Sequence, residues 1–164
     1  MLGVNPPVLS SVRIEFLYVS TGHNFFGRHG QQPLEFAARQ VAEAQCVAGR
    51  GIRGDRFFDY PHGHKGQVTF FSMEVFEEMC RELGVSDRSP SVLRRNVLVR
   101  GADLGSLVGG IFLLQGIEFE AVEECRPCYW MDGAFGPGAE AYLKGRGGLR
   151  ARILGDGVLR ASAR

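Results

Sequence analysis

Lysine is scarce in this sequence. Only Lys65 and Lys144 are lysines, whereas the other 17 of the 19 basic residues are arginines. A pyridoxal phosphate enzyme holds its cofactor on a lysine, so these two positions are the sole candidates and we expect no pyridoxal phosphate on this chain. Arginine, in contrast, is suited to bidentate capture of phosphate and carboxylate groups.

Long hydrophobic runs and a strong net charge are also lacking. No stretch approaches the ~18–20 consecutive apolar residues of a membrane span, and the opening segment MLGVNPPVLSSVRIEF has no basic region before an apolar run, as a signal peptide would. The net charge of +1 gives no overall electrostatic case for nucleic acid or membrane binding. We therefore expect neither partner.

Cysteine is sparse, with four among 164 residues. Without a secretory signal, these cysteines predict reduced thiols in a cytoplasmic protein. The length is typical of one domain, which we expect to span residues 1–164. Glycine, with 23 residues, is about twice as frequent as in an average protein, which indicates many tight turns.

Most of the regular structure that the sequence predicts is β-strand. Alternating or β-branched segments predict strands at 12–19, 67–71, 96–100, 111–115 and 117–123, and a hairpin turning at Gly155-Asp156-Gly157 near the end. Segment 34–48 is ambiguous, and its local propensity favours a helix. Strands close together in sequence favour an antiparallel barrel or sandwich.

One helix is clearly marked. Ser72 is a good N-cap, Phe76, Met79, Cys80 and Leu83 repeat at helical spacing, and Gly84 can end the helix in the left-handed conformation. A second, short helix is predicted at 137–144, with a proline at its start, and 124–136 is predicted as a loop.

The pair Cys125 and Cys128, spaced as CxxC directly after a strand, is the most informative chemical signal. A thioredoxin-like redox pair would need a βαβ context that the surrounding sequence lacks. A zinc site would need two more ligands, from His62 and His64 or from Cys46 and Cys80, and the latter two fit better as small core residues. The third interpretation is a single reactive or metal-ligating thiolate beside Arg126, whose charge would favour the thiolate.

Three further segments carry candidate binding residues. Arg94, Arg95 and Asn96 precede a strand. Two adjacent arginines in a strand point to opposite faces, so we expect at most one to reach a given ligand, while Asn96 could read a heterocycle edge. The glycines of 49–56 would let backbone amides approach an anion. Arg53 and Arg56 flank Asp55, which could orient one of them.

Two histidine-containing loops complete the candidates. His62, His64 and Lys65 form a locally basic loop, although a solvated role is the commoner one for such residues. The loop 21–33 contains His23, Asn24, Arg28 and His29, which could line a site or only shape a turn. Phe25 and Phe26 are expected to anchor this loop to the core.

Taken in order, four of these segments resemble the MOSC domain, the C-terminal domain of molybdenum cofactor sulfurase, which also occurs as small stand-alone bacterial proteins. They are GRGIRGDR (49–56), GQVTFFSMEVFEEM (66–79), LRRNVLVRGADL (93–104) and ECRPC (124–128). The resemblance implies a mainly β fold, a compact, mostly antiparallel β-barrel like the pyruvate kinase β-domain with one or two short helices. It therefore supports strands in 34–48 against the local propensity.

The resemblance also implies a cofactor and a key cysteine. In MOSC relatives a cysteine after a strand carries a persulfide or ligates the molybdenum of the molybdenum cofactor (molybdopterin), and the match makes Cys128 the catalytic and metal-binding residue here. Phosphate and pterin groups would call for arginines and an amide edge. The predicted cofactor-binding residues are Arg53, Arg56, Lys65, Arg94, Arg95 and Asn96.

The leading functional hypothesis is a molybdenum-cofactor-binding protein that reduces small N-hydroxylated molecules. Its electrons would come from a partner reductase, since no flavin or nicotinamide motif is visible. The alternative is a sulfur carrier with a persulfide on Cys128, supplied by a cysteine desulfurase that would itself hold any pyridoxal phosphate. A third interpretation is a zinc-stabilised structural β-barrel.

Overall fold

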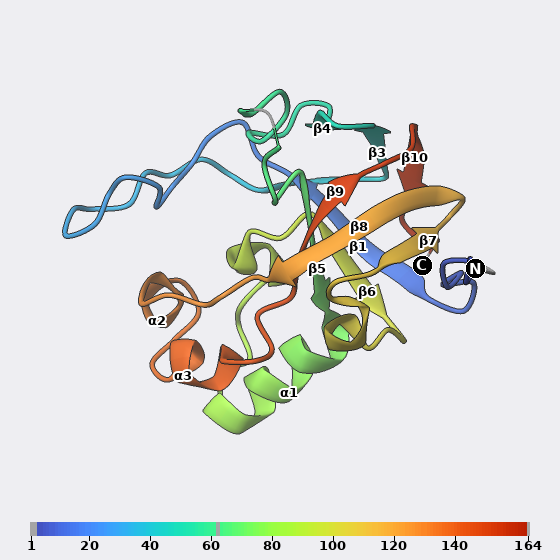
Figure 1. Ribbon diagram of the computed structural model, residues 1–164. Coiled ribbons are helices and arrows are strands. Elements are labelled where there is room, and N and C mark those ends of the chain that lie inside the picture. Colours follow the sequence, from blue (N-terminus) through green and yellow to red (C-terminus); the bar gives the residue numbers. More distant parts are fainter. Residues whose placement is uncertain (1–2, 62, 164) are drawn as a thin grey trace.

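The computed structural model describes residues 3–61 and 63–163, in which strands outnumber helices. His62 lies outside the described residues. The elements are β1 (Arg13–Val19), β2 (Arg39–Val41), β3 (Glu43–Val47), β4 (Gly51–Ile52), β5 (Val68–Ser72), α1 (Met73–Leu83), β6 (Val97–Arg100), β7 (Ile111–Leu114), β8 (Ile117–Glu124), α2 (Trp130–Ala134), α3 (Ala139–Leu143), β9 (Leu149–Ile153) and β10 (Gly157–Arg160), with short 3-10 turns η1 (Pro90–Leu93) and η2 (Leu104–Leu107) (Figure 1).

The strands form two sheets, and the expected closed barrel is not confirmed. One sheet has the order β2-β1-β6-β5-β9-β8-β7 and the other the order β10-β3-β4. The chain passes from the first sheet to the second at Ala42, between β2 and β3, so β2 remains an edge strand. The described strand pairs are antiparallel except β5 with β6, which agrees with the mainly antiparallel prediction.

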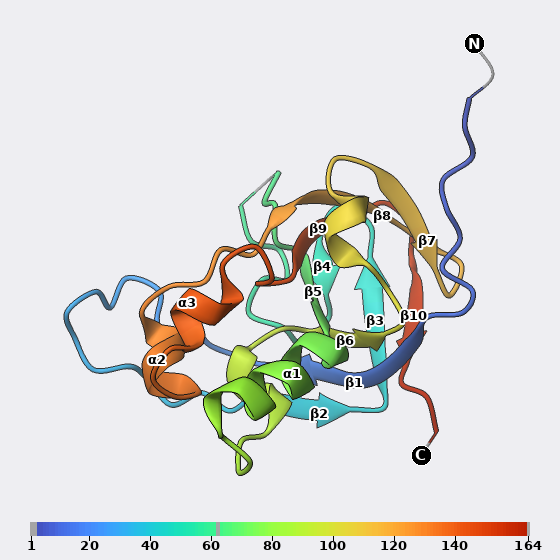
Figure 2. The same cartoon turned by 90° about the horizontal axis from the view of Figure 1, so that it is seen from below.

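Alternation along the central strands produces two clusters of buried side chains. Val68 and Phe70 of β5 point to the cluster that the second sheet covers, whereas Phe71 points to the cluster beneath the helices. The three helices of the described chain cover the side of the large sheet toward which Phe71 points, as Figures 1 and 2 show. The large sheet is therefore buried on both faces over its centre.

Helix α1 forms as the sequence predicts. The Ser72 hydroxyl accepts a hydrogen bond from the Val75 amide, and Gly84 ends the helix with φ of 64°. Met73, Phe76 and Met79 are buried. Local capping and one apolar stripe suffice to define this element.

Three other local predictions need comment. Segment 34–48 forms β2 and β3, so the helix that local propensity favoured is wrong there, because pairing with β1 and β10 outweighs propensity. The segment expected to be a loop after β8 contains α2, a helix of five residues. The predicted short helix at 137–144 is confirmed as α3.

The predicted terminal hairpin is wrong. Strand β9 pairs with β5 and β8, and β10 pairs with β3 in the other sheet. Gly155 and Gly157 are not among the described glycines with positive φ. A Cβ at Gly157 would lie 2.6 Å from Ile117 Cγ1, so this glycine serves a close approach between the sheets rather than a tight turn.

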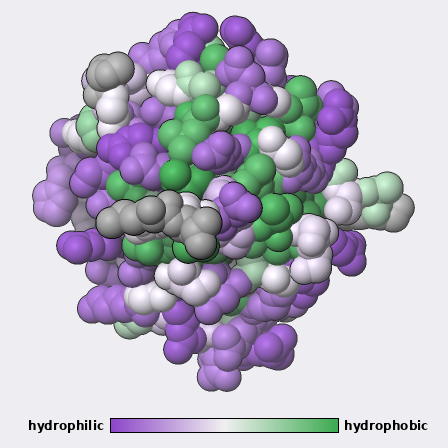
Figure 3. All heavy atoms as spheres, turned by 45° about the vertical axis from the view of Figure 1, so that its right-hand side comes forward, coloured by the Kyte–Doolittle hydropathy of each residue, from purple (hydrophilic) through white to green (hydrophobic). Residues whose placement is uncertain are grey.

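In the view of Figure 3, hydrophobic side chains gather around the centre of the face and hydrophilic side chains predominate toward its rim. None of the helices within residues 3–61 and 63–163 is long and apolar enough to cross a membrane.

Candidate functional site

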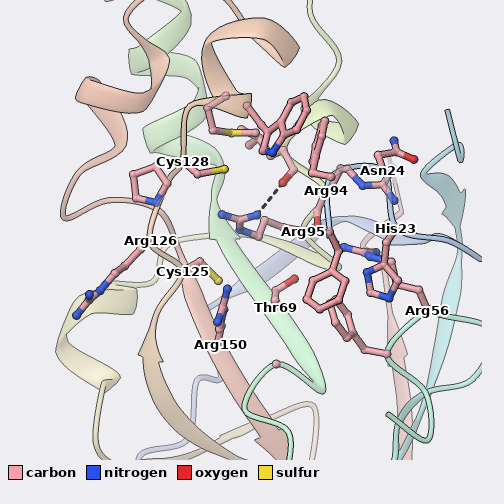
Figure 4. A pocket seen from close by; sticks show the side chains of 18 of the residues that line it. His23, Asn24, Arg56, Thr69, Arg94, Arg95, Cys125, Arg126, Cys128 and Arg150 are labelled. Atoms are coloured by element: carbon pink, nitrogen blue, oxygen red, sulfur yellow. Dashed lines mark hydrogen bonds between the residues drawn. The ribbon is translucent and has the colours of Figure 1, made fainter. Parts of the chain in front are cut away.

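A cavity of about 420 Å³ brings together segments that are far apart in the sequence (Figure 4). Its volume is within the range of small-molecule and cofactor pockets. Its walls come from the loop after β1, the loop after β4, strand β5, the η1 to β6 connection, the CxxC segment and β9. Its lining residues are His23, Asn24, Phe25, Phe26, Arg56, Phe57, Tyr60, His64, Gly66, Thr69, Leu93, Arg94, Arg95, Cys125, Arg126, Pro127, Cys128, Trp130, Met131 and Arg150.

The CxxC segment presents its two thiols differently. Cys125 is 3% exposed, and its amide donates to the Gly148 carbonyl at 2.8 Å. Cys128 is exposed at the cavity, immediately before α2. A Cβ at Gly147 would lie 1.9 Å from the Cys125 carbonyl oxygen, so only glycine allows the chain to pass here. The backbone thus holds Cys125 inside and leaves Cys128 accessible.

This arrangement does not fit a thioredoxin-like redox pair, whereas the zinc interpretation includes His62, which lies outside the described residues. Cys125 is separated from the first residue of α2, Trp130, so it does not occupy a helix N-terminus as a thioredoxin nucleophile would. Within the described residues no group of three or more His, Cys, Asp or Glu side chains could hold a metal ion. Cys46 is buried in the apolar core, where burial raises its pKa to about 12.

The cations nearest the thiols differ from the one predicted. In Figure 4 the Arg126 side chain points away from both cysteine sulfurs, while Arg95 and Arg150 extend toward the part of the cavity where those sulfurs lie. The sequence suggested Arg126 because it is adjacent along the chain. Chain direction after β8 turns it outward, and distant segments supply the guanidinium groups instead.

Arg94 and Arg95 both line the cavity, although adjacent residues of a strand would point to opposite faces. Arg94 follows η1 with φ of 55° and lies before β6 begins, so strand alternation does not apply to it. Arg95 donates to the Gly147 carbonyl at 3.0 Å and to the Leu93 carbonyl at 2.8 Å. It thereby links the η1 to β6 connection to the chain that passes Cys125.

Asp55 orients Arg56, as the sequence allowed. The Asp55 carboxylate is fully buried and accepts hydrogen bonds from the amides of Ser20 at 3.1 Å and Phe57 at 3.2 Å, and from Arg56 Nη1 at 3.4 Å. The Arg56 guanidinium lies 4.8 Å from the centre of the Phe57 ring. Burial lowers the pKa of Arg56, and the charge of Arg95 acts in the same direction.

The cavity is electropositive. Arg56, Arg94, Arg95 and Arg150 all line it, and the described lining contains no Asp or Glu. Arg94 and Arg95 donate to neutral carbonyl and hydroxyl oxygens. Burial and then the charge of Arg56 lower the pKa of Arg94 to about 10, so it stays protonated at neutral pH. Clustered guanidiniums of this kind favour an anionic ligand.

Three predicted binding residues lie elsewhere among the described positions. Arg53 is exposed and stacks over Phe58 at 5.3 Å. Lys65 pairs with Glu123 at 3.2 Å beside a smaller cavity of about 320 Å³. Asn96 is 3% exposed, so its side chain lies in the interior of the protein.

The Asn96 amide is engaged inside the protein. Its Oδ1 accepts from the Thr69 amide at 3.0 Å and from the Thr69 hydroxyl at 3.1 Å, and its Nδ2 donates to the Tyr18 carbonyl at 3.1 Å. It therefore joins β1, β5 and β6 directly behind the cavity wall that Thr69 forms.

One side of the cavity is aromatic. The His23 ring lies 4.9 Å from Phe57, and the His64 ring lies 4.8 Å from Phe57 and 4.6 Å from Tyr60. Burial lowers the pKa of both histidines, with Arg56 adding to the effect at His23 and Arg150 at His64. Both imidazoles therefore favour the neutral form near pH 7. The rings of this wall are tilted against one another, with an angle of 80° between His23 and Phe57 and of 53° between Tyr60 and His64.

Sequence reasoning named His23 and His64 as candidates but missed Phe57, Tyr60, Trp130 and Arg150. Phe57 directly follows the GDR segment, which is the one signal that could have singled it out. Arg150 lies in a strand whose register is not visible in the sequence, and Trp130 lies in the helix that was not predicted.

Comparison with known proteins identifies the family. The model of the MOSC domain matches residues 58–163. Among solved structures, the YuaD protein from Bacillus subtilis is similar with a TM-score of 0.67 and 22% identity, over 92% of this chain and 91% of that one. YiiM from Geobacillus stearothermophilus gives a TM-score of 0.65 and 15% identity, over 91% and 71%. YiiM from Escherichia coli gives 0.59 and 16%, over 88% and 65%.

A search of curated proteins finds no match to this chain. The structural similarities, all at low identity, establish the fold alone. The family match covers well over half of the sequence and includes Cys125, Cys128 and most of the cavity lining. The chain is therefore a member of the MOSC domain family, a family associated with binding and sulfuration of the molybdenum cofactor.

Proposed function

We propose that this protein binds the molybdenum cofactor in the cavity described above, with the Cys128 thiolate as the protein ligand of the metal. The observation that carries the proposal is an exposed thiol at a cavity whose described lining includes five arginines and no carboxylate. Thiolates are suitable ligands for soft metal centres, and guanidinium groups suit phosphate.

The lining fits the chemistry of this cofactor. The cofactor carries a phosphate and a heterocycle, and the cavity offers arginines and aromatic rings, with the Arg56 guanidinium over the Phe57 ring. Arg56, Arg95 and Arg150 are the proposed anion ligands. Arg53 and Lys65 lie outside the cavity and are left out of the proposed site, and Asn96 supports it from behind. Arg94 is considered separately below.

The reaction that we propose is the two-electron reduction of an N–O bond in a small N-hydroxylated molecule. In that reaction R–NH–OH takes up two electrons and two protons and gives R–NH₂ and water. The bound cofactor would supply the redox chemistry, and a separate reductase would supply the electrons. The protein's part is to hold the anionic group on its arginines, to place the Cys128 sulfur, and to offer the substrate the aromatic rings around His23 and His64, whose imidazoles favour the neutral form.

A second candidate function is supported by the exposure of Cys128. A thiol at the surface can be reached by another protein, as a sulfur carrier requires. In that case Cys128 would hold a persulfide received from a cysteine desulfurase, and pyridoxal phosphate would belong to that partner. Four free cysteines fit a cytoplasmic protein in either case.

The two functions are separated by elemental analysis and intact-mass spectrometry of protein produced in cells that make the cofactor. Near-stoichiometric molybdenum in the wild type, lost in Cys128→Ser and kept in the control Cys80→Ser, supports the cofactor-binding function. Cys80 is a suitable control because it lies on α1, outside the cavity lining. A persulfide on Cys128 without molybdenum would replace this function by the carrier. Zinc that depends on Cys128 would overturn both.

A further inference from the structure

The chain from Gly22 to Phe36 forms a long loop without regular secondary structure. In Figures 1 and 2 it projects from the end of β1 and returns to β2 beside α2. Its first residues, from His23 to Phe26, line the cavity. Any change in the position of this loop therefore changes the shape of the proposed binding site.

Hydrogen bonds close the loop at its base. The Asn24 side chain donates to the Phe36 carbonyl at 3.2 Å and accepts from the Phe36 amide at 2.7 Å, and the Leu34 amide donates to the Asn24 carbonyl at 2.9 Å. The Phe36 ring lies directly over Gly22, where even a Cβ would clash at 2.4 Å. The two ends of the loop are thus held side by side.

The Arg94 guanidinium binds both of these ends. Nη1 donates to the Phe36 carbonyl at 2.7 Å, and Nη2 donates to the Gly22 carbonyl at 2.7 Å and to the Ser20 hydroxyl at 2.9 Å. At least three of its five N–H donors are therefore used, two on the loop ends and one on Ser20 just before the loop. The Arg94 carbonyl in turn accepts from Arg56 at 3.3 Å.

Both the first residues and the middle of the loop contact the residues that follow Cys128. The Phe25 ring stacks on Trp130 with the ring centres 4.9 Å apart, and the Gly30 amide donates to the Tyr129 hydroxyl at 3.4 Å. His29 packs edge-on against Tyr129. The loop thus reaches from Arg94 to the start of α2, across the cavity.

We infer that Arg94 is a positioning residue: by holding both ends of the loop Gly22–Phe36, it keeps Phe25 on Trp130 and so fixes the cavity wall beside Cys128. The sequence suggested a direct contact between Arg94 and a cofactor. The observed contacts instead place its guanidinium on the loop, because its hydrogen bonds reach the carbonyls at both loop ends, Gly22 and Phe36, and the Ser20 hydroxyl beside them. Its importance for the reaction rests on the proposed function, but its effect on the loop does not.

The test uses Trp130, the single tryptophan of the chain, as the reporter. Arg94→Gln removes the charge and the forked geometry, and Arg94→Lys restores the charge. Arg160→Gln is the matched control, since Arg160 of β10 pairs with Glu43 of β3 on the smaller sheet, away from the loop. Far-UV circular dichroism checks that each variant is folded, and acrylamide quenching of the fluorescence measures access to the indole ring.

We expect Arg94→Gln to raise the quenching constant about twofold, because the ring loses its stacking partner Phe25 when the loop moves away. Arg94→Lys is expected to restore part of the wild-type value, and Arg160→Gln all of it. A folded Arg94→Gln with wild-type quenching would overturn the inference. If Arg94→Gln does not fold, Asn24→Ala takes its place, because it loosens the same loop base at a partly exposed position. This variant must raise the quenching constant, and an unchanged constant would overturn the inference as well.

Molybdenum analysis of the same variants separates this inference from the proposed function. If the wild type carries molybdenum, Arg94→Gln should carry several-fold less while Arg160→Gln carries the wild-type amount. A wild type without molybdenum would refute the proposed function and leave the quenching result valid. Raised quenching together with full molybdenum content would show that Arg94 positions the loop and would refute an effect of the loop position on cofactor binding.

Discussion

Replacing Asn96 by alanine should destabilise the whole fold. Three hydrogen bonds of its side chain are lost, two to Thr69 and one to the Tyr18 carbonyl, all in the buried interior. At about 1 kcal/mol net for each bond, the free energy of unfolding should fall by about 3 kcal/mol. For a chain of this size that corresponds to a Tm lower by about 6–12 °C.

Urea unfolding followed by far-UV circular dichroism measures this loss. The control is Asn24→Ala, whose two side-chain hydrogen bonds lie in an exposed loop and whose removal should cost about 1 kcal/mol or less. If Asn96→Ala lowers the free energy of unfolding by less than about 0.5 kcal/mol, the described hydrogen bonds do not hold the strands together, and the original expectation that Asn96 faces a ligand would regain support.

Three other predictions concern the same region. Gly147→Ala should destabilise the protein by about 1–3 kcal/mol, because its Cβ would meet the Cys125 carbonyl at 1.9 Å, and an unchanged Tm would contradict this close approach. Burial lowers the pKa of His64 in the folded state, so the unfolded chain takes up a proton at a higher pH and the stability falls as the pH drops through about 6.5 and below. His64→Gln should therefore reduce the Tm difference between about pH 7.5 and pH 5.5. An equal Tm difference in both proteins would refute the lowered pKa of His64. Iodoacetamide at about pH 8 should label exposed Cys128 well before Cys46, whose pKa burial raises to about 12, and peptide mass spectrometry showing equal rates would contradict the described burial.

The sequence predicts those parts of the fold that local chemistry determines. Helix α1 carries its own cap, apolar stripe and terminal glycine, so it is predicted well. The pairing of β9 and β10 is not predicted, because two strands joined by a short link can enter different sheets when tertiary contacts require it. The same reason explains segment 34–48, in which helix-forming residues are recruited into strands.

The site was predicted in part, for a similar reason. A CxxC pair is rare enough to be noticed in a sequence, and the GDR segment pointed to Arg56. Burial and backbone conformation are not visible there. Asn96 was therefore assigned to a ligand although it joins strands, and the positive φ of Arg94 could not be foreseen. Arg150 reaches the cavity only through the arrangement of the sheet.

The central claim is that Cys128 holds the metal of a bound molybdenum cofactor. The most direct measurement is the molybdenum-to-protein ratio of wild type and Cys128→Ser, purified side by side from cells that make the cofactor. The account predicts a ratio near one for the wild type and near zero for the variant, with both proteins equally folded. Equal molybdenum in the two proteins, or none in the wild type, would contradict it.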